Sequence, residues 1–483
     1  MDKLKILFLS AEVEPYSKTG GLADVAGALP FALARNGGCE VRVVSPYYGM
    51  TRKSGHSLEE ILKVSGGRGP GGTDAFEVLG KRAGGVRFYF IKKDEYYDRP
   101  YIYGTPQGDY PDNLARFSLF CKAALESAAR VGFYPDIIHT NDWETALVPL
   151  YLKDLPAGHS LKTAKVLYSI HNLAYQGTFS VREASVTGLA KDTLSGISEG
   201  GSINLMKAGI RYAHAISTVS KGYARQILTA EYGCALEGEL KKRKEELYGI
   251  SNGVDYTKWD PSTDDLISRN YDIDSLEDKD HCKADLKKET DLDISADTPL
   301  IGSVGRLTEQ KGIDIIIESM EKIVSSGFGM VLLGAGDAVY EKRLKGLGAA
   351  YKGKFTVKIG FDNTLAHKIE AGSDIFVIPS RYEPCGLNQM YSLRYGTIPV
   401  VRATGGLDDT ITDYTDDPEK GNGFKFEDAS SPDFMDALRR ALKSYRDKSV
   451  WRMLQKRGME LDFSWERSAD EYLALYRRLK GDS

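Results

Sequence analysis

The stretch KILFLSAEVEPYSKTGGLADVAGAL, residues 5–29, decides the fold class. It begins with a short apolar run of the length of a buried strand, passes through a polar loop with two adjacent glycines, and continues with the apolar spacing of a helix. A strand that leads through a glycine turn into a helix is the first half of a βαβ unit. This stretch therefore predicts an α/β protein built on parallel sheets.

Short β-branched runs alternate with helical patterns along the rest of the chain. In the first half we expect strands at residues 5–10, 40–45, 86–91, 137–140, 165–169 and 215–218, and helices at 22–36, 114–131, 146–153 and 221–228. After an acidic, weakly periodic stretch at 260–280, we expect strands at 300–304, 330–333, 355–359, 375–379 and 398–401, and helices at 313–324, 363–371, 432–445, 450–461 and 464–480. The chain has 483 residues, and single cores stop growing at roughly 250 to 300. Two doubly wound halves are therefore expected.

Charge and composition exclude several classes of protein. The 64 Lys and Arg residues nearly balance the 68 Asp and Glu residues, so the net charge of −4 argues against a nucleic-acid partner. The apolar runs are too short for a signal peptide or a membrane span. Five scattered cysteines without CxxC spacing argue against a disulfide framework and a cysteine-built metal site. We expect a soluble cytoplasmic protein with no membrane partner.

Glycine is in excess, with 50 residues, and one pair lies where the first strand turns into a helix. Lys18 precedes Gly20 and Gly21, and Asp24 follows them. Backbone N–H groups at such a turn can bind an anion, and glycines allow a diphosphate to come close. Asp24 could hold a sugar hydroxyl. The same glycines would equally suit a tight turn without a ligand.

The second half repeats this arrangement with other residues. Arg306 and Lys311, in GRLTEQKG at 305–312, follow a predicted strand. Open α/β sheets bind ligands beyond the carboxyl ends of their strands, and two cations there match a nucleotide diphosphate. Two solvated surface charges would give the same pattern.

Two further turns in this half carry a carboxylate and glycines after a strand. SRYEPCGLN, at 380–388, brings Glu383 to a strand end, and TGGL, at 404–407, adds another glycine turn. A carboxylate beside a helix N-terminus suits hydroxyls and phosphate together.

Two segments of the first half combine a histidine, polar groups and an aromatic side chain directly after a strand. They are HTNDW at 139–143, which contains Asp142, and HNLAYQG at 171–177, which begins at His171. Such mixtures bind sugars, because polar groups take hydroxyls and aromatic faces cover C–H surfaces. A purely structural histidine is the alternative at each position. Neither a catalytic triad nor an HExxH metal motif is present.

Together the motifs resemble the glycogen and starch synthase family of retaining glucosyltransferases, in its bacterial form. The similar motifs, in order, are SAE at 10–12, KTGGLADV at 18–25, YDRP at 97–100, DN at 112–113, RF at 116–117, HTNDW at 139–143, HNLAYQG at 171–177, NGVD at 252–255, WDP at 259–261, GRLTEQKG at 305–312, EPCGL at 383–387, YGTIP at 395–399, TGGLDDT at 404–410 and FSW at 463–465. They cover nearly the whole chain.

The resemblance implies a GT-B architecture, in which two Rossmann-like doubly wound domains face each other across a deep cleft. It implies an acceptor-side domain at 1–251 joined by a returning C-terminal helix at 463–483, and a nucleotide-sugar donor domain at 252–462. It also implies transfer of glucose from ADP-glucose to the non-reducing end of an α-1,4-glucan such as glycogen, with retention of configuration and with neither a metal nor another cofactor. Tyr472 and Tyr476 give the last helix an apolar stripe that has to dock.

Site residues carry over from the family one by one. The catalytic set implied is His171, whose carbonyl stabilises oxocarbenium character, Glu383, which orients the donor glucose, Arg306 and Lys311, which stabilise the departing diphosphate, and Asp142. The donor-binding set implied is Lys18, Gly20, Gly21, Asp24, Asn252, Phe361, Cys385, Gly386, Leu387, Asn388 and Gly406.

Three positions qualify the resemblance. Asn388 stands where some relatives carry Thr, Phe361 stands where the family often stacks adenine on Tyr, and Tyr391 stands where related GT-B families have a second Glu. The alternatives that stay open are a synthase that prefers UDP-glucose and an inactive glucan-binding homologue. A glucan phosphorylase would need a pyridoxal phosphate lysine, for which no segment argues.

Overall fold

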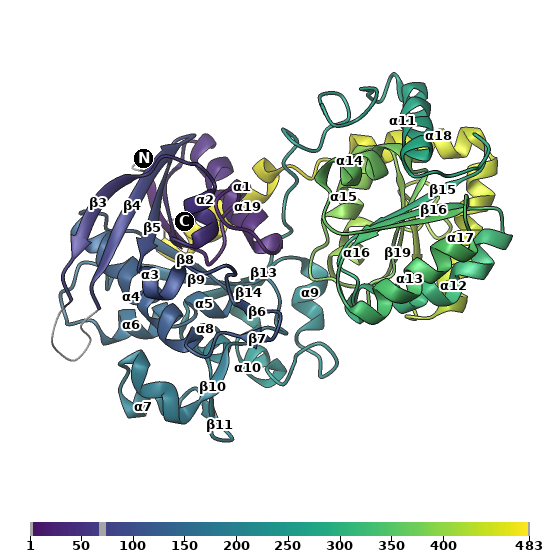
Figure 1. The fold of residues 1–483 in the computed structure, drawn as a ribbon. Coiled ribbons are helices and arrows are strands. Elements are labelled where there is room, and N and C mark those ends of the chain that lie inside the picture. Colours follow the sequence, from purple (N-terminus) through teal and green to yellow (C-terminus); the bar gives the residue numbers. More distant parts are fainter. Residues whose placement is uncertain (1–2, 67–73, 482–483) are drawn as a thin grey trace. The chain divides into compact units, whose positions relative to one another are not determined.

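The computed structural model describes residues 3–66 and 74–481 (Figure 1). The chain divides into two compact units, Met1–Gly253 with Trp465–Ser483, and Val254–Ser464. Each boundary lies two residues after the expected one. Both units are doubly wound α/β folds on largely parallel sheets.

Unit 1 is built on a nine-stranded sheet in the order β14-β13-β9-β8-β1-β2-β5-β4-β3. Its strands are β1 (Leu4–Leu9), β2 (Cys39–Pro46), β3 (Glu59–Val64), β4 (Phe76–Ala83), β5 (Val86–Lys92), β8 (Ile137–Asn141), β9 (Lys165–Ile170), β13 (Ala215–Thr218) and β14 (Leu247–Gly249). The strands from β14 to β5 are parallel, and β4 and β3 extend the sheet as antiparallel strands. Two small sheets lie outside it, β6 (Gly104–Thr105) with β7 (Gly108–Asp109), and β10 (Thr178–Ser180), β12 (Ser202–Asn204) and β11 (Ser198–Glu199).

Unit 1 contains eleven α-helices among the described residues, several of which connect its parallel strands. They are α1 (Gly21–Arg35), α2 (Gly49–Lys53), α3 (Asp94–Tyr97), α4 (Asn113–Arg130), α5 (Asp142–Thr145), α6 (Val148–Asp154), α7 (Lys191–Ser195), α8 (Leu205–Tyr212), α9 (Lys221–Gln226), α10 (Glu237–Lys242) and α19 (Trp465–Lys480), with 3₁₀ helices η1 (Val181–Thr187) and η2 (Lys244–Glu246).

The last helix belongs to the core of unit 1, although it ends the chain. In Figure 1 the yellow α19 lies beside the purple α1. Tyr472 and Tyr476 are buried in one cluster with Leu29 and Leu33 of α1 and with Phe8 of β1. The tyrosine stripe therefore docks on the sheet face that α1 covers.

Unit 2 has a six-stranded, fully parallel sheet in the order β17-β16-β15-β18-β19-β20. Its strands are β15 (Leu300–Val304), β16 (Gly329–Gly334), β17 (Phe355–Ile359), β18 (Ile375–Ile378), β19 (Ile398–Arg402) and β20 (Phe424–Phe426). Its helices are α11 (Lys279–Glu289), α12 (Ile313–Ser325), α13 (Ala338–Ala350), α14 (Asn363–Gly372), α15 (Asn388–Arg394), α16 (Gly405–Thr410), α17 (Ser431–Arg446) and α18 (Lys448–Glu460), with 3₁₀ helices η3 (Leu276–Asp278) and η4 (Glu309–Lys311).

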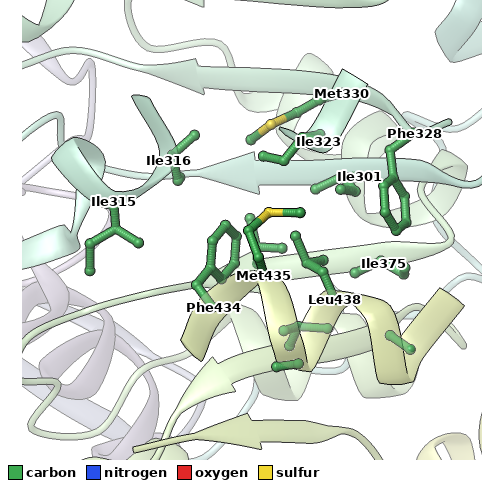
Figure 2. Packing of buried hydrophobic residues seen from close by; sticks show 14 of the residues in the cluster. Ile301, Ile315, Ile316, Ile323, Phe328, Met330, Ile375, Phe434, Met435 and Leu438 are labelled. Atoms are coloured by element: carbon green, nitrogen blue, oxygen red, sulfur yellow. The ribbon is translucent and has the colours of Figure 1, made fainter. Parts of the chain in front are cut away.

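Alternate residues of these strands pack on opposite faces of the sheet. Ile301 joins the cluster that α12 and α17 cover, and its neighbour Leu300 joins the cluster of α11 and α14. Figure 2 shows Phe434, Met435 and Leu438 of α17 in the first cluster. A sheet buried on both faces needs apolar side chains at both registers, which is why its strands read as continuous apolar runs.

Apart from β4, which lies next to the edge strand, the strands that the sequence did not predict are edge strands or short ones. β3 alternates charged and apolar residues and is largely exposed, and β14 and β20 have three residues each. Neither kind gives the apolar run that identifies a central strand. In the part of the chain that the structure describes, no helix is long and apolar enough to cross a membrane.

Candidate active site

In each unit most of the predicted residues follow strands at or near the point where the connections change direction, whereas Asn252 follows β14 and Phe361 follows β17, at sheet edges. In unit 1 that point is between β1 and β8, and in unit 2 it is between β15 and β18. Helices that leave in opposite directions open a crevice at the carboxyl ends of the strands there, and ligands of such sheets bind in it. The two sets of residues are described unit by unit.

The glycine pair after β1 is not required by the local backbone. Gly20 has an extended backbone, with φ −148°, and a Cβ added at Gly20 or Gly21 would meet no atom within 4 Å. A tight turn alone therefore does not explain these glycines. Lys18 Nζ lies 2.5 Å from Asp24 Oδ1, and both side chains are partly exposed.

A buried carboxylate that the sequence analysis assigned no role shapes this loop. Glu12 Oε2 accepts hydrogen bonds from the N–H groups of Thr19 and Gly20, and Oε1 accepts from Thr19 Oγ1. The Gly20 N–H is thus already bonded within the loop, and the donor-binding role of Gly20 stays a prediction. Lys18 and the open space at Gly20 and Gly21 remain for an anion.

Asp142 and His171, predicted from separate motifs, are in direct contact. Asp142 follows β8 and His171 follows β9, its neighbour in the sheet. Asp142 Oδ1 accepts the His171 N–H at 2.8 Å, and the Asn172 N–H also bonds this carboxylate. His171 Nε2 lies 2.9 Å from Asn141 Oδ1. The bond from the Asn172 N–H therefore holds in place the peptide group that contains the His171 carbonyl.

Burial sets the protonation of this pair. It lowers the pKa of the His171 imidazole to about 4, so the ring is neutral at neutral pH. Burial also raises the pKa of the Asp142 carboxyl, and the two backbone N–H groups oppose that shift. A neutral imidazole is a poor source of positive charge, and any electrostatic role of His171 rests on its dipoles.

Asn252 and His139 differ in what surrounds them. Asn252 is 8% exposed, and its Oδ1 has no hydrogen-bond partner among the described residues. His139 is fully buried, with Nδ1 2.6 Å from Tyr476 Oη and Nε2 2.6 Å from Ser169 Oγ. Asn252 therefore keeps its amide oxygen available as a hydrogen-bond acceptor. Both ring nitrogens of His139 are already bonded inside the core, which agrees with a purely structural histidine.

In unit 2 the structure brings Lys311 and Glu383 together. Glu383 is 7% exposed, and its Oε2 accepts from Lys311 Nζ at 2.5 Å and from Ser380 Oγ at 3.0 Å. Both of these side-chain bonds use Oε2. Arg306 begins the same loop after β15, and its Nη2 donates to Gln310 Oε1 at 3.1 Å.

Close packing fixes where Lys311 lies. Gly312 has φ +67°, and a Cβ there would stand 2.1 Å from the Pro379 carbonyl oxygen. Arg381 donates through both terminal nitrogens to Asp314, at 3.0 and 2.7 Å. The loops after β15 and β18 are therefore joined, and Lys311 is held at the end of β18.

The segment at Cys385–Asn388 leads from this carboxylate into α15. Gly386 has φ +73°, where glycine is favoured, and Cys385 is buried. Leu387 is the N-cap of α15. Asn388 Nδ2 donates to the Val304 carbonyl at 2.7 Å, so Asn388 ties the helix to the end of β15.

Gly406 and Phe361 have opposite surroundings. The Gly406 N–H donates to the Glu383 carbonyl at 3.1 Å, and a Cβ on Gly406 would stand 2.1 Å from the Cys385 carbonyl oxygen. Gly406 therefore allows the two loops to pack closely, and its donor-binding role stays a prediction. Phe361, after β17, is 92% exposed.

Tyr391, where related families have a second Glu, forms part of an aromatic stack. Trp259 lies between Tyr391 and His367, with ring centroids 4.0 and 3.7 Å away and nearly parallel planes. Among the described residues, no group of three or more His, Cys, Asp and Glu side chains is arranged to hold a metal ion.

Family models and relatives match almost the entire chain. Residues 5–242 match the starch synthase catalytic domain, and residues 286–456 match glycosyl transferases group 1. Glycogen synthase 2 of Geobacter sulfurreducens is 43% identical over 478 residues, 98% of each chain. Glycogen synthase of Koribacter versatilis is 44% identical over 484 residues, 99% of this chain and 98% of its own.

A solved structure agrees at the level of the fold. The catalytic domain of starch synthase IV from Arabidopsis thaliana, bound to ADP and acarbose, matches with a TM-score of 0.90 at 33% identity, over 99% of this chain and 100% of that one. This match confirms the predicted GT-B class. With 43% identity to glycogen synthases over 98% of its length, the chain belongs to the glycogen and starch synthase family of glycosyltransferases.

Proposed function

We propose that this protein is a glycogen synthase that transfers glucose from ADP-glucose to the non-reducing end of an α-1,4-glucan, with retention of configuration and without a metal ion. The observation that carries the proposal is the buried Glu383 carboxylate, paired through Oε2 with Lys311 at the switch point of unit 2. Because Lys311 and Ser380 both use Oε2, Oε1 is suited to accept a sugar hydroxyl.

In the proposed transfer reaction, the leaving nucleoside diphosphate needs stabilisation of its charge more than it needs a proton. A departing nucleoside diphosphate develops negative charge, and cations that are already in place stabilise it best. Arg306 and Lys311 lie on one loop that is joined to the Glu383 loop, so the same rigid unit would hold both the sugar and the leaving group.

His171 supplies a dipole to the reacting sugar in this proposal. Its N–H is fixed on Asp142, which orients the peptide, and its imidazole is neutral at neutral pH because burial lowers the pKa. A carbonyl dipole can stabilise oxocarbenium character without forming a bond. Lys18, at the open glycine loop, is proposed for the donor's phosphates.

Two observations support the proposed binding of adenine and of a glucan. The Phe361 ring is almost fully exposed, and an exposed aromatic face suits stacking on a base. The matching starch synthase structure is described as bound to ADP and acarbose. We therefore expect ADP-glucose as donor and a glycogen or maltooligosaccharide chain as acceptor.

The substrate assay compares two donors on one acceptor. Release of nucleoside diphosphate with glycogen as acceptor is measured with ADP-glucose and with UDP-glucose, each with and without EDTA. We expect faster turnover with ADP-glucose and no effect of EDTA. A higher kcat/KM with UDP-glucose would overturn the donor assignment, and no release with either donor would overturn the enzymatic function.

The residue assignment is tested by Lys311→Ala and Glu383→Ala. Each is expected to fold and to lose on the order of 10² to 10³-fold in kcat, because loss of one preorganised charge costs about that much. Lys322→Ala and Glu318→Ala on the exposed face of α12 serve as matched controls. Wild-type kcat in either site variant would remove that residue from the mechanism.

A further inference from the structure

Gln310, in the loop after β15, makes three hydrogen bonds that join the loops of the candidate site. Its backbone carbonyl accepts the Arg381 N–H at 2.8 Å. Its side-chain Nε2 donates to the Tyr382 carbonyl at 3.3 Å, and its side-chain Oε1 accepts from Arg306 Nη2 at 3.1 Å. The side chain of Gln310 therefore lies between a cation after β15 and the turn after β18.

The two side-chain partners decide which end of the Gln310 amide faces which loop. A guanidinium only donates hydrogen bonds, and a backbone carbonyl only accepts them. If the amide were turned over, its NH₂ group would face the Arg306 guanidinium and its oxygen would face the Tyr382 carbonyl, so both bonds would be lost. The side chain is therefore held in one orientation by partners on two different loops.

The turn at 381–383 is bound at each of its three backbone carbonyls. The donors are, in chain order of the carbonyls, Arg402 at the end of β19, Gln310, and the N–H of Gly406 in α16. Three neighbouring loops thus hold the backbone that carries the buried carboxylate. Through Gln310 this backbone is also connected to the Arg306 guanidinium.

We propose that Gln310 is a positioning residue for glucosyl transfer, because its amide keeps the Arg306 guanidinium and the Glu383 turn at a fixed separation. Arg306 is assigned to the leaving diphosphate and Glu383 to the donor glucose, so their separation has to match the bond between a sugar and its phosphate. The catalytic part of this inference rests on the proposed function, whereas the joining of the two loops by Gln310 does not.

The bond from Gln310 reduces the cost of placing Arg306. Arg306 is exposed, and a long charged side chain loses rotamer freedom when it is ordered. A guanidinium that is already held by Gln310 Oε1 needs less reorganisation when charge develops on the leaving group. A misplacement of about 1 Å in such a site can reduce the rate about 100-fold.

Two variants and one control test this role. Gln310→Met keeps the length of the side chain and removes both amide bonds. Gln310→Glu keeps an acceptor for Arg306 but places an oxygen against the Tyr382 carbonyl. The control is Gln455→Met, because Gln455 of α18 is buried and donates to the Gly396 carbonyl at 2.9 Å. That bond precedes β19 and so lies at the amino end of the strand, away from the candidate site.

Kinetics with ADP-glucose and glycogen separate positioning from stability. In both Gln310 variants we expect kcat to fall about 10- to 100-fold and the KM for ADP-glucose to change less, because the binding groups remain but are not held in place. Gln455→Met should lower the urea midpoint at least as much as Gln310→Met and keep the wild-type kcat. Wild-type kcat in either Gln310 variant, or equal losses of kcat in Gln310→Met and Gln455→Met, would overturn the proposal.

A double-mutant comparison shows whether Gln310 acts through Arg306. In an Arg306→Ala background the guanidinium is gone, so Gln310→Met should reduce kcat by a smaller factor than in the wild type. The same factor in both backgrounds would overturn the connection between the two residues.

Hydrogen exchange tests the joining of the loops without substrate. The Arg381 N–H is bonded to Gln310, and the peptide that contains it should exchange several-fold faster in Gln310→Met and at the wild-type rate in Gln455→Met. An unchanged rate in Gln310→Met would overturn the joining role. If the wild type transfers no glucose but the exchange pattern holds, the proposed function fails and the joining role stands. Gln310→Glu provides the same comparisons if Gln310→Met fails to fold.

Discussion

Asp142 shows how much one residue of the site is determined by the backbone. It is one of a few non-glycine residues with positive φ, at +53°, a conformation that costs of order 1 kcal/mol or more for a residue with a Cβ. The bonds from the N–H groups of His171 and Asn172 offset that cost. Strain of this kind persists where the surroundings fix a functional group.

His171 makes the stability of the protein depend on pH in a defined window. Its pKa is lowered to about 4 in the folded state, against about 6.5 in an unfolded chain. The unfolded state therefore binds the proton first, and stability is lost as the pH falls from about 6.5 to about 4. The contribution is at most about 3 kcal/mol.

Urea unfolding at pH 7 and at pH 4.5 measures this term. His171→Asn removes the titrating ring, so its free energy of unfolding should fall less between the two pH values than that of the wild type. Equal losses in the two proteins would show that His171 is not buried as a neutral ring.

The sequence placed the site residues better than it explained them. Lys311, Glu383, Asp142 and His171 are candidates because each follows a predicted strand, and the family resemblance implies their catalytic roles, which stay predictions. Glu12 also follows such a strand, in the SAE motif at 10–12, but the sequence does not show that it accepts from backbone N–H groups, since that role is defined by the turn around it. Residue types show which chemistry is possible, but not which donor is already occupied.

At the scale of elements, the glycine turns are of two kinds that look alike in sequence. Gly20 and Gly21 have open space where a side chain would lie, whereas a Cβ on Gly406 would overlap the Cys385 carbonyl oxygen. The first kind leaves room for a ligand, and the second lets two loops pack.

This difference predicts opposite phenotypes for one substitution. Gly406→Ala should lose about 2 to 4 kcal/mol of unfolding free energy, because backbone atoms have to move. Gly21→Ala should change stability by about 0.5 kcal/mol or less and raise the KM for the sugar nucleotide. Urea titration and donor kinetics measure the two effects.

Gly346, in α13 with nothing within 4 Å of an added Cβ, is the matched control. Gly346→Ala should gain about 0.5 to 1 kcal/mol and leave the KM unchanged. A Gly406→Ala variant as stable as the wild type would refute the packing role, and a Gly21→Ala variant with unchanged KM would refute the open-loop role.

Prediction of elements succeeded where a strand carries a short run rich in β-branched residues. The strands expected at 215–218, 300–304 and 355–359 have those bounds in the structure. The antiparallel extension β4 and β3 was missed, because the edge strand faces solvent and its charged residues interrupt the apolar run.

At the scale of the whole molecule, unit 2 is inserted into unit 1. The chain leaves unit 1 after Gly253 and returns at Trp465. The two passages run side by side, since the Val254 N–H donates to the Phe463 carbonyl at 2.7 Å. A Cβ on Gly253 would stand 2.5 Å from Trp465 Cα, so glycine permits this approach. The first unit is complete only after the last helix is synthesised.

A chain that ends at Ser464 should therefore lose unit 1 and keep unit 2. Trp465, Tyr472 and Tyr476 of α19 are buried in the core of unit 1, and loss of each large aromatic side chain costs about 3 to 5 kcal/mol. Three such losses, about 9 to 15 kcal/mol, are comparable to the 5 to 15 kcal/mol by which a domain is typically stable. Amide hydrogen exchange should show fast exchange across β1, β2 and β8 and native protection across β15, β16 and β18.

The control is a chain that ends at Lys480, which keeps all of α19 and should match the full chain in every peptide. Loss of protection in both units of the shorter chain would mean that unit 2 depends on unit 1 for its own stability. Protection retained in unit 1 would mean that α1 and the sheet suffice without the returning helix. The buried aromatic side chains of α19 pack against α1 and the sheet of unit 1. Only a loss of protection confined to unit 1 therefore agrees with a core that is built from both ends of the chain.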